Sequence, residues 1–582
     1  MAALFLVRNQ DPDSAGAAID AARTQFALHG FTGLAEKTLP GWRLLHAPHI
    51  IGGPESLIED GDDLVAVAGT VTWDDLMGRP ALEALLRDIS LPDPDWSRLG
   101  GQFAAVIRRG GRCFLLTDHF AMFQLFHDRG MTVFSTSLLS AVAALPSVSF
   151  DRQGVYEFAF NVAPIGDDTV FEELKTLGPD RTVELLRDGV QIHRAARPLP
   201  ERPAHLPIEE RLERHKACLA SAVRPYVRFF GDHVHCPLSG GLDSRLLLAA
   251  LRAEGCRPHV YVYGSADSGD VRIARRIGDA LDFEVAWVDK EAKALAPNEF
   301  PEQVERNFQQ NDGLPSFGEL FENGMNSAAR EARHAGGAMS ASGACGEIYR
   351  NFFYIADRPT SADAVARTFF ARYARGDSTG AFDEREFLRR VGAKIAASLG
   401  VAEPRQRLPR PLVEQVYPRV RCRALSGREI SLEGRYGAYL MPFLDRDVVA
   451  EAMTLPLALK NAGRFEAMLL ESIDPQLARL PSVYGHDFAT PPSFRHRFGE
   501  WSTRVRPVWL RHRSYEIRRR LGPMADEHGG LLGDEWLGRV IDLRYPAMRR
   551  YFRIQNIRDS GLLRRIANLE YLARRLGGKL VG

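Results

Sequence analysis

The sequence predicts an α/β protein with two domains, an antiparallel sheet domain followed by a domain built on a parallel sheet. Residues 1–200 contain short β-branched and apolar runs separated by turns, a pattern typical of antiparallel hairpins. After residue 205, apolar runs alternate with segments of helical periodicity, and this order indicates βαβ units. At about 150 residues per domain, the 582 residues are enough for both.

The first 200 residues are expected to form a mixed α/β domain. Two segments have helical periodicity, 15–29 and 79–87. Gly110-Gly111 separates two of the apolar runs and predicts a tight turn between antiparallel strands. The expected strands are 64–72, 101–107, 113–117, 131–134 and 182–186.

A polar, proline-bearing stretch, residues 194–205, is expected to link the two domains, so the boundary is placed near residue 200. Beyond it we expect, in order, helix 209–226, strand 233–238, helix 244–253, strand 259–263 and helix 270–281. The rest of the chain is mostly helical by periodicity and has no repeat of fixed period.

The composition argues against several classes of protein. Lys and Arg total 75 against 74 Asp and Glu, so a net charge of +1 provides no global attraction to nucleic acid or anionic lipid. The chain has no apolar stretch of the about 18 residues that a membrane span needs. Six scattered cysteines without a CxxC pair argue against a disulfide framework or structural zinc. We therefore expect a cytoplasmic protein with neither a membrane nor a nucleic acid as partner.

One segment departs from this balance of charge. Residues 495–520 carry nine arginines and only two acidic residues, Glu500 and Glu516. Two interpretations stay open at this point. The segment is either the solvated face of a helix, or a surface for an acidic peptide or RNA.

The segment Leu238-Ser-Gly-Gly-Leu-Asp-Ser244 stands where a strand should end and a helix begin. Its two glycines let main-chain N–H groups approach an anion closely, and the N-terminus of the following helix adds a partial positive charge. Phosphate is the anion expected there, with Ser239 and Ser244 adding hydroxyl donors. Asp243 suits such a site if Mg²⁺ lies between its carboxylate and the phosphate. Because the lysine of GxxxxGK[ST] is missing, the segment is not a Walker loop.

At these residues the sequence resembles the PP-loop ATP pyrophosphatases, and further segments narrow the resemblance to the asparagine synthetase family. Gly264 and Asp270 stand at the family's spacing after the second strand. Five other segments of the chain resemble further motifs of the family: Ser342 to Glu347, Pro442 to Asp445, Gly101 to Ala104, Asp118 to Phe126 and Phe134 to Ser137. The resemblance implies an Ntn-type αββα glutaminase-like domain over 1–200. It also implies a PP-loop, adenine nucleotide α-hydrolase-like domain with a large helical region over 205–582.

Departures from the family pattern indicate a branch without glutaminase activity. Ala2 stands where glutamine-hydrolysing members have their cysteine nucleophile, and Ala68-Gly69-Thr70 replaces their Asn-Gly-Glu segment. Glu347 replaces the metal-binding aspartate, and residues 481–488 have no lysine. Ala344 stands where β-lactam synthetases have a tyrosine. A lost glutaminase, an intact ATP loop and an altered acceptor pocket together resemble the lasso-peptide cyclases, which are macrolactam synthetases.

The resemblance implies a ligase in which a carboxylate attacks the α-phosphorus of ATP, and an amine then attacks the mixed anhydride and releases AMP. The catalytic carboxylates Asp243 and Glu347 would hold Mg²⁺. Pyrophosphate would bind to Ser239, Gly240, Gly241 and Ser244. The nucleoside would lie against Leu238, Tyr263, Gly264, Ser342 and Gly343. A base must take the proton of the amine, and the candidates are His486, Asp487, Glu429 and Glu433.

Macrolactam formation in a lasso-type peptide is the reaction that these features favour, with ATP and Mg²⁺ as cofactors. Its partners would be a peptide substrate, a leader-peptide-binding protein and a leader peptidase. An ammonia-dependent asparagine synthetase-like reaction, or another amide synthesis on a small-molecule carboxylate, stays open as an alternative. A nucleotide-binding scaffold without turnover is the alternative from another class.

Overall fold

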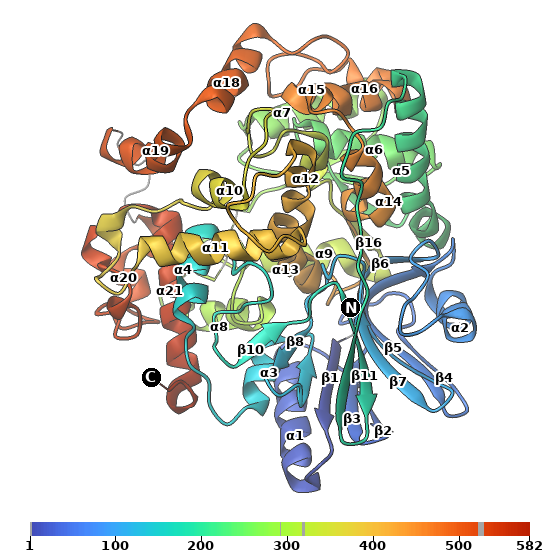
Figure 1. Cartoon of the computed structure of the whole chain (residues 1–582), viewed down its shortest axis with the longest axis vertical. Coiled ribbons are helices and arrows are strands. Elements are labelled where there is room, and N and C mark those ends of the chain that lie inside the picture. Colours follow the sequence, from blue (N-terminus) through green and yellow to red (C-terminus); the bar gives the residue numbers. More distant parts are fainter. Residues whose placement is uncertain (1–2, 291–292, 317–319, 522–528, 582) are drawn as a thin grey trace.

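The computed structural model describes residues 3–290, 293–316, 320–521 and 529–581 (Figure 1). The α/β class expected from the sequence is confirmed. Two antiparallel sheets lie in the chain up to Arg194, and a parallel sheet begins at Val234. Ala2, on which the expected loss of the glutaminase rests, lies outside the described residues.

The first sheet has the strand order β10-β8-β9-β1-β3-β2. Its strands, in chain order, are β1 (Ala3–Arg8), β2 (Ala35–Leu39), β3 (Trp42–Ala47), β8 (Phe126–Asp128), β9 (Val133–Ser135) and β10 (Leu174–Thr176). In β1, Leu4 and Leu6 belong to the main core, whereas Phe5 and Val7 pack with helix α1 (Pro12–Leu28). Both faces of β1 are thus buried, and its continuous apolar run hides the alternation that identifies a strand.

The second sheet has the order β12-β11-β7-β6-β5-β4. Its strands are β4 (Leu57–Asp60), β5 (Asp63–Trp73), β6 (Leu99–Arg109), β7 (Arg112–Thr117), β11 (Arg181–Leu186) and β12 (Gly189–Arg194). The turn expected at Gly110-Gly111 joins β6 to β7, and both glycines have positive φ, +58° and +79°. Two such residues in succession define the turn that matches the twist of a hairpin, so glycine suits both positions.

The two antiparallel sheets pack face to face, with helices on their outer faces. Helix α1 lies on β1 and β3, and helix α2 (Gly78–Asp88) lies on β4 and β5. The layers therefore run helix, sheet, sheet, helix, in the lower part of Figure 1. The core between the sheets is continuous with the core of the rest of the chain.

The parallel sheet has the order β15-β14-β13-β16-β17. Its strands are β13 (Val234–Pro237), β14 (His259–Tyr263), β15 (Val285–Val288), β16 (Met339–Ala341) and β17 (Tyr439–Leu440). Helices α5 (Ile208–Phe230), α6 (Leu242–Ala253) and α7 (Gly269–Leu281) alternate with the first strands. The expected βαβ order is confirmed here, and strand 259–263 has the expected bounds.

Most of the remaining chain is helical, as the sequence predicts. The other α-helices are α3 (Leu138–Ala144), α4 (Arg152–Asn161), α8 (Phe300–Gln310), α9 (Met325–His334), α10 (Ala362–Phe369), α11 (Glu384–Ser398), α12 (Arg410–Glu414), α13 (Arg423–Glu433), α14 (Arg446–Met453), α15 (Leu457–Lys460), α16 (Arg464–Ile473), α17 (Pro475–Ala478), α18 (Phe494–Val505), α19 (Val508–Leu521), α20 (Asp534–Leu537) and α21 (Ser560–Leu576).

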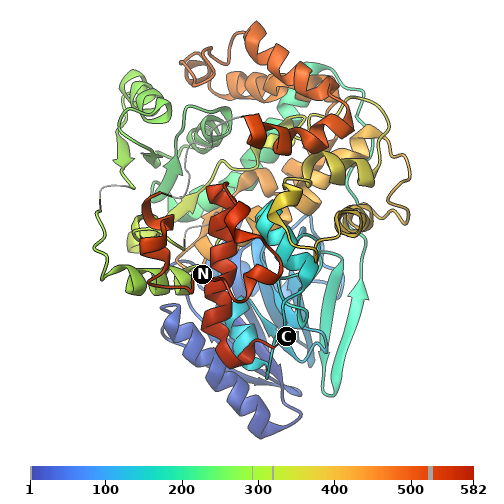
Figure 2. The ribbon, with the colours of Figure 1, turned by 90° about the vertical axis from the view of Figure 1, so that its left-hand side faces the viewer.

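The end of the chain returns to its first half. Helix α21, red in Figure 2, packs against α4, and Val148 forms a β-bridge with Leu580. The sequence pattern near residue 200 marks where the antiparallel sheets end. It does not divide the chain into two independent bodies, because the last helix, α21, packs against α4 of the first half.

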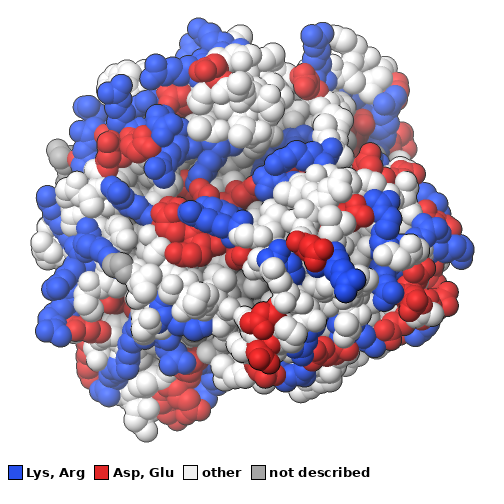
Figure 3. Space-filling model, turned by 60° about the horizontal axis from the view of Figure 1, so that its bottom comes forward, with Lys and Arg blue, Asp and Glu red and all other residues white. Residues whose placement is uncertain are grey.

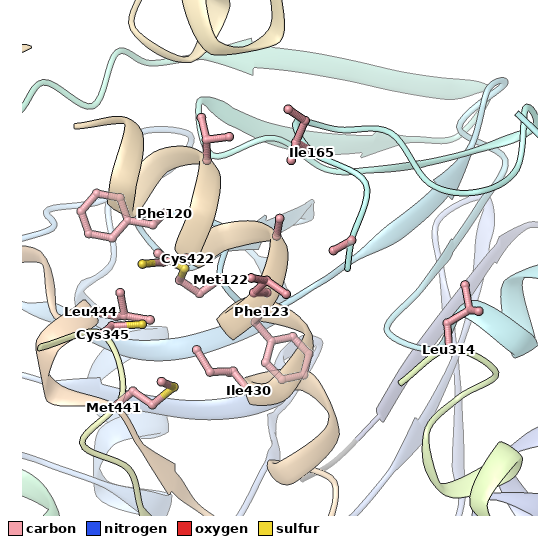
Figure 4. Close-up of a cluster of buried hydrophobic side chains, with 14 of the residues drawn as sticks. Phe120, Met122, Phe123, Ile165, Leu314, Cys345, Cys422, Ile430, Met441 and Leu444 are labelled. Carbon is pink, nitrogen blue, oxygen red and sulfur yellow. The ribbon is translucent and has the colours of Figure 1, made fainter. Parts of the chain in front are cut away.

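An apolar interface also joins the two halves. Figure 4 shows side chains from the segment after β7 facing side chains that follow β16 and β17, or that belong to α13 and the helical turn before it. The labelled members include Phe120, Met122 and Phe123 from the first half, and Cys345, Cys422, Ile430, Met441 and Leu444 from the second. Because these residues are almost fully buried, the halves share one hydrophobic core.

A buried carboxylate, Asp312, forms a polar clamp at the same junction. It accepts hydrogen bonds from the main-chain N–H groups of Leu138 and Leu139, at 2.6 and 3.0 Å, at the start of α3. Arg435 and Arg428 of the second half pair with the same carboxylate at 2.9 and 3.3 Å. The Asp312 side chain has no exposed surface. One charge thus satisfies groups from both halves.

We expect Asp312→Ala to lower the free energy of unfolding by about 3–5 kcal/mol, because two buried guanidinium groups lose their counter-charge. Although burial alone raises it, Arg435 and His29 hold the pKa of Asp312 well below its usual range. Its stabilisation is therefore complete above the unfolded-state pKa of about 3.9 and is lost as the pH falls toward the folded-state value. Urea unfolding between pH 7 and pH 3 measures both effects.

The matched control is Asp62→Ala, whose side chain is 92% exposed. Its free energy of unfolding should change by less than about 0.5 kcal/mol. Equal effects of the two substitutions would contradict the role given to Asp312.

The surface carries both signs of charge. Figure 3 shows basic and acidic side chains interspersed over one face of the molecule. Among the helices within the described ranges, none is both long and apolar enough to cross a membrane.

Candidate functional site

The segment singled out by the sequence, residues 238–244, connects β13 to α6. Strand β13 is the middle strand of the parallel sheet. From it the chain builds β14 and β15 on one side, then crosses back to place β16 on the other side. Ligands of open parallel sheets bind at the carboxyl ends of the strands where the order reverses in this way. The fold therefore places the Ser239–Ser244 loop at the position in the sheet best suited to bind a ligand.

The N-terminus of α6 suits an anion. Its N-cap residue is Gly241, which has no side chain to accept hydrogen bonds from the first turn. The N–H groups of that turn and the helix dipole point toward the carboxyl end of β13, where a phosphate is stabilised. Burying Leu242, Leu246 and the other apolar residues of α6 in the core fixes the direction of this helix.

Within the loop, hydrogen bonds already hold the polar groups in place. The main-chain N–H of Ser239 donates to Ser244 Oγ at 3.0 Å, and the two serine hydroxyl oxygens are also 3.0 Å apart. Gly241 N–H donates to Ser239 Oγ at 3.2 Å, and Gly240 N–H donates to Asp270 Oδ1 at 2.7 Å. Asp270, at the start of α7, is thus brought to the loop. A phosphate that uses the N–H of Gly240 has to replace this carboxylate.

A second loop, residues 342–346, follows β16 and packs tightly on the first. A Cβ atom on Gly343 would lie 2.9 Å from the carbonyl oxygen of Asp243. A Cβ atom on Gly346 would lie 2.8 Å from Asp243 Cγ. Glycine is therefore required at both positions, and Cys345 between them has a positive φ of +73°. The two segments that the sequence predicts to bind nucleotide are brought into contact.

Asp243 is not free. Arg350 donates to Asp243 Oδ1 at 2.6 Å and to Glu466 Oε2 at 2.7 Å. Although burial alone would lower it, Glu466 and Asp243 raise the pKa of Arg350 well above its usual range. Burial raises the pKa of Glu466 well above its usual range even though Arg350 opposes this. Arg350 thus bridges Asp243 at the start of α6 and Glu466 on α16.

Sequence reasoning missed both Arg350 and Glu466. A signal for Glu466 was present, because it follows Phe465 on the buried face of α16, between apolar residues that pack in the core. An acidic residue on the apolar face of a helix needs a partner. Nothing in the sequence identified Arg350 as that partner, since it lies 116 residues earlier.

Glu347, expected to bind a metal together with Asp243, also has another partner. Its Oε2 accepts a hydrogen bond from the hydroxyl of Tyr417 at 2.8 Å. Within the described ranges, no group of three or more His, Cys, Asp or Glu side chains is placed to hold a metal ion. The side chains by themselves do not form a metal centre. Mg²⁺ commonly takes only one or two carboxylates from a protein and the remaining ligands from phosphates and water.

The residues expected around the nucleoside are spread over the ends of β13, β14 and β16. Leu238 is 1% exposed and packs in the core, so only its main chain is left to contact a ligand. The hydroxyl of Tyr263 accepts a hydrogen bond from Arg333, and Lys290 Nζ lies 4.1 Å from the centre of the Tyr263 ring. Gly264 has a φ of +135° and accepts a hydrogen bond from Trp287 Nε1 through its carbonyl. Ser342 Oγ accepts from the N–H of Ala344 at 3.2 Å.

A cavity of about 110 Å³ lies beside the loop. Its walls come from the start of α6, residues 350–354, residues 462–467, residues 484–492 and α18. The polar lining comprises Arg350, Tyr354, Tyr484, His486, Asp487, Thr490, His496 and Glu500. His486 and Arg350 therefore line the same cavity.

The tautomer of His486 follows from its hydrogen bond. Its Nδ1 lies 3.2 Å from the carbonyl oxygen of Tyr484. Since a carbonyl oxygen only accepts, Nδ1 carries the proton of the neutral ring and Nε2 carries the lone pair. His486 can thus act as a base through Nε2.

Arg245 holds the segment that carries His486. From the interior of α6 it donates to the carbonyl oxygens of Leu480, at 2.8 Å, and Pro481. Its guanidinium lies 4.9 Å from the centre of the Phe488 ring. Burial lowers the pKa of Arg245 to about 10. Because the segment is anchored in this way, Val483 covers the loop. The main-chain N–H of Val483 donates to the carbonyl oxygen of Gly240 at 3.2 Å.

The other proposed bases have different partners. Glu433 pairs with Arg333 and Arg330 at 2.6 and 2.8 Å. Although burial alone raises it, these arginines hold the pKa of Glu433 well below its usual range. Glu429 accepts a hydrogen bond from Ser316 and pairs with Arg330. A carboxylate held in such pairs is a weak base, so Glu433 and Glu429 are poorer candidates than His486.

Known proteins give little help with this site. No known family matches the chain, and no curated protein matches it. Solved structures that match include one described as the allosteric regulatory enzyme of purine biosynthesis. Another is the glutamine phosphoribosylpyrophosphate amidotransferase from B. subtilis complexed with ADP and GMP.

Both matches cover half of this chain. Each is 11% identical over 50% of it, with a TM-score of 0.23, and they cover 80% and 91% of the respective matched chains. At that level of likeness they carry no argument about the site.

We expect Gly346→Ala to destabilise the protein by about 1–3 kcal/mol, because its Cβ has to displace the Asp243 carboxyl group. The free energy of urea unfolding measures this cost. The substitution should also reduce any rise in melting temperature that ATP produces. Gly376→Ala is the matched control, since a Cβ there meets open space. If both variants are as stable as the wild type, the two loops do not pack as described.

Proposed function

We propose that the chain is an ATP-dependent ligase that joins a carboxylate to an amine and releases AMP and pyrophosphate. The observation that carries the proposal is the position of the Ser239–Ser244 loop. It ends the middle strand of a parallel sheet at the point where the strand order reverses, and it leads into a helix whose N-terminus has no side-chain cap. The resemblance of the same loop to the asparagine synthetase family supports ATP as the ligand.

The residues of the site have distinct roles in this proposal. The N–H groups at the start of α6, with Ser239 and Ser244, bind the phosphates and stabilise the charge of the leaving pyrophosphate. Arg350 adds a positive charge at the same place once it turns from Asp243 to a phosphate. Asp243 and Glu347 are the carboxylates that would hold Mg²⁺, which when bound neutralises phosphate charge.

His486 is proposed as the base for the amine. It shares the cavity with Arg350, and its Nε2 carries the lone pair. The amine that attacks the anhydride has to lose a proton, and a base within the same cavity accepts it. Segment 481–488, which carries His486, also covers the loop and limits the access of water that would hydrolyse the anhydride.

The substrate class that we propose is a peptide that supplies both the carboxylate and the amine, as in macrolactam formation. Three features of the sequence support this proposal: the missing cysteine nucleophile, the intact loop, and a segment 481–488 without lysine. A leader-peptide-binding protein and a leader peptidase are the partners that such a reaction needs. Aspartate with ammonia is the small-molecule alternative and forms a separate arm of the test.

We expect the wild type to release pyrophosphate and AMP from ATP and Mg²⁺ in the presence of its acceptor. A precursor peptide encoded beside the gene should lose the mass of one water, whereas aspartate with ammonia should give asparagine if the small-molecule alternative holds. Asp243→Ala should lower pyrophosphate release by about 100-fold or more, because the carboxylate at the loop is lost. Enzyme-coupled pyrophosphate detection and mass spectrometry measure these outcomes.

Asp279→Ala, an exposed position on α7, is the control for this substitution and should behave as the wild type. Turnover that survives in Asp243→Ala would contradict the assigned role of the loop.

A second candidate, a nucleotide-binding scaffold without turnover, is favoured by one observation. Both proposed metal ligands are engaged by the protein itself, Asp243 by Arg350 and Glu347 by Tyr417. A cation can bind to Asp243 only if Arg350 leaves, so the site as described suits a nucleotide better than a metal–nucleotide complex. The substitution of Arg350 tests which of the two candidates holds.

If the chain is a ligase, Arg350→Ala should lower pyrophosphate release by about 10²-fold, because a group that stabilises phosphate charge is lost. If it is a scaffold, the wild type shows no turnover, and Arg350→Ala binds ATP with Mg²⁺ more tightly since Asp243 is released. Isothermal titration with ATP, with and without Mg²⁺, measures the second effect. Arg276→Ala, exposed on α7, is the control.

A further inference from the structure

Helix α18 exposes an apolar stripe. Phe494, Phe498, Trp501 and Val505 recur at helical spacing, and their exposed fractions are 74%, 53%, 49% and 52%. The rings of Phe494 and Phe498 stack at 5.9 Å, and those of Phe498 and Trp501 lie 5.7 Å apart. In most surface helices such a stripe faces the core. Here it faces away from it.

The opposite face of α18 explains this orientation. Glu500 accepts a hydrogen bond from the main-chain N–H of Ala462 at 2.7 Å. His496 lies 3.6 Å from Glu500, and both side chains line the cavity beside the loop. The polar face of the helix is therefore committed to the candidate site, and the apolar stripe is left outside.

Helix α19 extends the exposed patch. Val508 and Trp509, at its start, are 37% and 66% exposed. Arg511 fastens α19 to the body by donating to the carbonyl oxygens of Phe353 and Tyr354, at 2.7 and 2.8 Å. Figure 1 shows α18 and α19 at the upper left edge, away from the antiparallel sheets. Val508 and Trp509 follow the last residue of the stripe, Val505, by three and four positions and are exposed as it is.

The charges that flank the stripe in the sequence are positive, apart from Glu500. Of the residues that the structure describes, none forms an ion pair with Arg495, Arg497, Arg504 or Arg506. Glu500 does not compensate them, since it faces the cavity. Burial is the main cause that lowers the pKa of Arg511 to about 10, and the positive charges of Arg506 and Arg372 add to it. A surface with this field attracts negative charge.

We propose that the stripe and its arginines form a docking surface for an acidic polypeptide segment with apolar side chains. Aromatic residues and arginine are the side chains that contribute most to protein–protein binding, and they occur here together. Acidic side chains of the partner complement Arg495, Arg497 and their neighbours, while its apolar side chains cover the stripe. The first of the two interpretations of residues 495–520, a merely solvated face, does not account for four exposed large apolar residues in one row.

The position of the surface indicates what the partner does. A helix is about 10–12 Å across with its side chains, so a segment bound outside α18 lies one helix diameter from the cavity on its inner side. We therefore assign the surface to the polypeptide that carries the carboxylate to be activated. This assignment rests on the proposed function, whereas the binding of an acidic segment does not.

Binding is tested on the full chain without ATP, by fluorescence anisotropy with a labelled synthetic peptide. The probe has three heptads with leucine at positions a and d and glutamate or glutamine elsewhere. We expect saturable binding that weakens as salt is raised, because the charges involved are exposed. The double variant Phe498→Ser/Trp501→Ser and the double variant Arg495→Glu/Arg497→Glu should each weaken binding by about tenfold or more.

Two control variants keep the test specific. Leu28→Ser removes a 54% exposed leucine from α1, and Arg385→Glu reverses an exposed charge on α11. Both should bind the acidic peptide as the wild type does. A peptide with lysine in place of glutamate should not bind.

Other occupants are distinguished by the same variants. The proposal is overturned if the acidic peptide does not bind, or if the stripe and charge variants bind it unchanged. It is also overturned if the stripe instead mediates binding to phosphatidylserine vesicles or to single-stranded RNA, or self-association in sedimentation. Because the readout is binding and not turnover, failure of this proposal is distinguishable from failure of the ligase function.

Discussion

The site depends on one steric constraint, the contact between the loops that end β13 and β16. Gly343 and Gly346 leave no space for a side chain against Asp243, so the second loop lies directly on the first. This contact brings Ser342 and Glu347 to the same edge of the sheet as Ser239 and Ser244. It also fixes the start of α6, whose N-terminus points toward the carboxyl end of β13. A larger residue at either glycine would separate the groups that a nucleotide has to contact together.

Buried charge is the second constraint, and it recurs at three places. Asp312 joins the two halves of the chain, Glu433 joins α9 to α13, and Glu466 with Arg350 joins α16 to the loop after β16. Removing one member of such a group leaves an unpaired charge, so these contacts are costly to break. Each group accepts only one arrangement of its elements. The candidate site is thus surrounded by contacts that fix its geometry. A phosphate bound there has to change two of them, the bond between Arg350 and Asp243 and the bond between Gly240 and Asp270.

Helix α18 connects this chemistry to the surface of the molecule. Its inner face provides His496 and Glu500 to the cavity, and its outer face carries the apolar stripe, with Arg495, Arg497 and Arg504 on the same helix. In our proposals this short helix therefore has two roles, one on each face: it forms a wall of the site, and it offers a surface for binding a polypeptide. A ligand in the cavity and a partner on the outer face both contact α18, so each can affect the binding of the other. The tie between Glu500 and Ala462 is the contact through which such an effect would pass.

The sequence by itself determined the features that depend on neighbouring residues. The Ser239–Ser244 loop between strand and helix, the Gly110-Gly111 turn and the βαβ order all follow from local pattern, because a turn or a helix start is fixed by a few adjacent residues. The sequence did not predict the strands β1, β2, β3, β4, β8, β10, β12, β15, β16 and β17.

Only the tertiary structure decided the pairing of Arg350 with Asp243 and Glu466, which lie 107 and 116 residues away. It also decided which face of α18 is exposed, since Glu500 can turn inward only where Ala462 is present to donate to it. Contacts between distant segments are set by packing of the whole chain, and no local pattern encodes them.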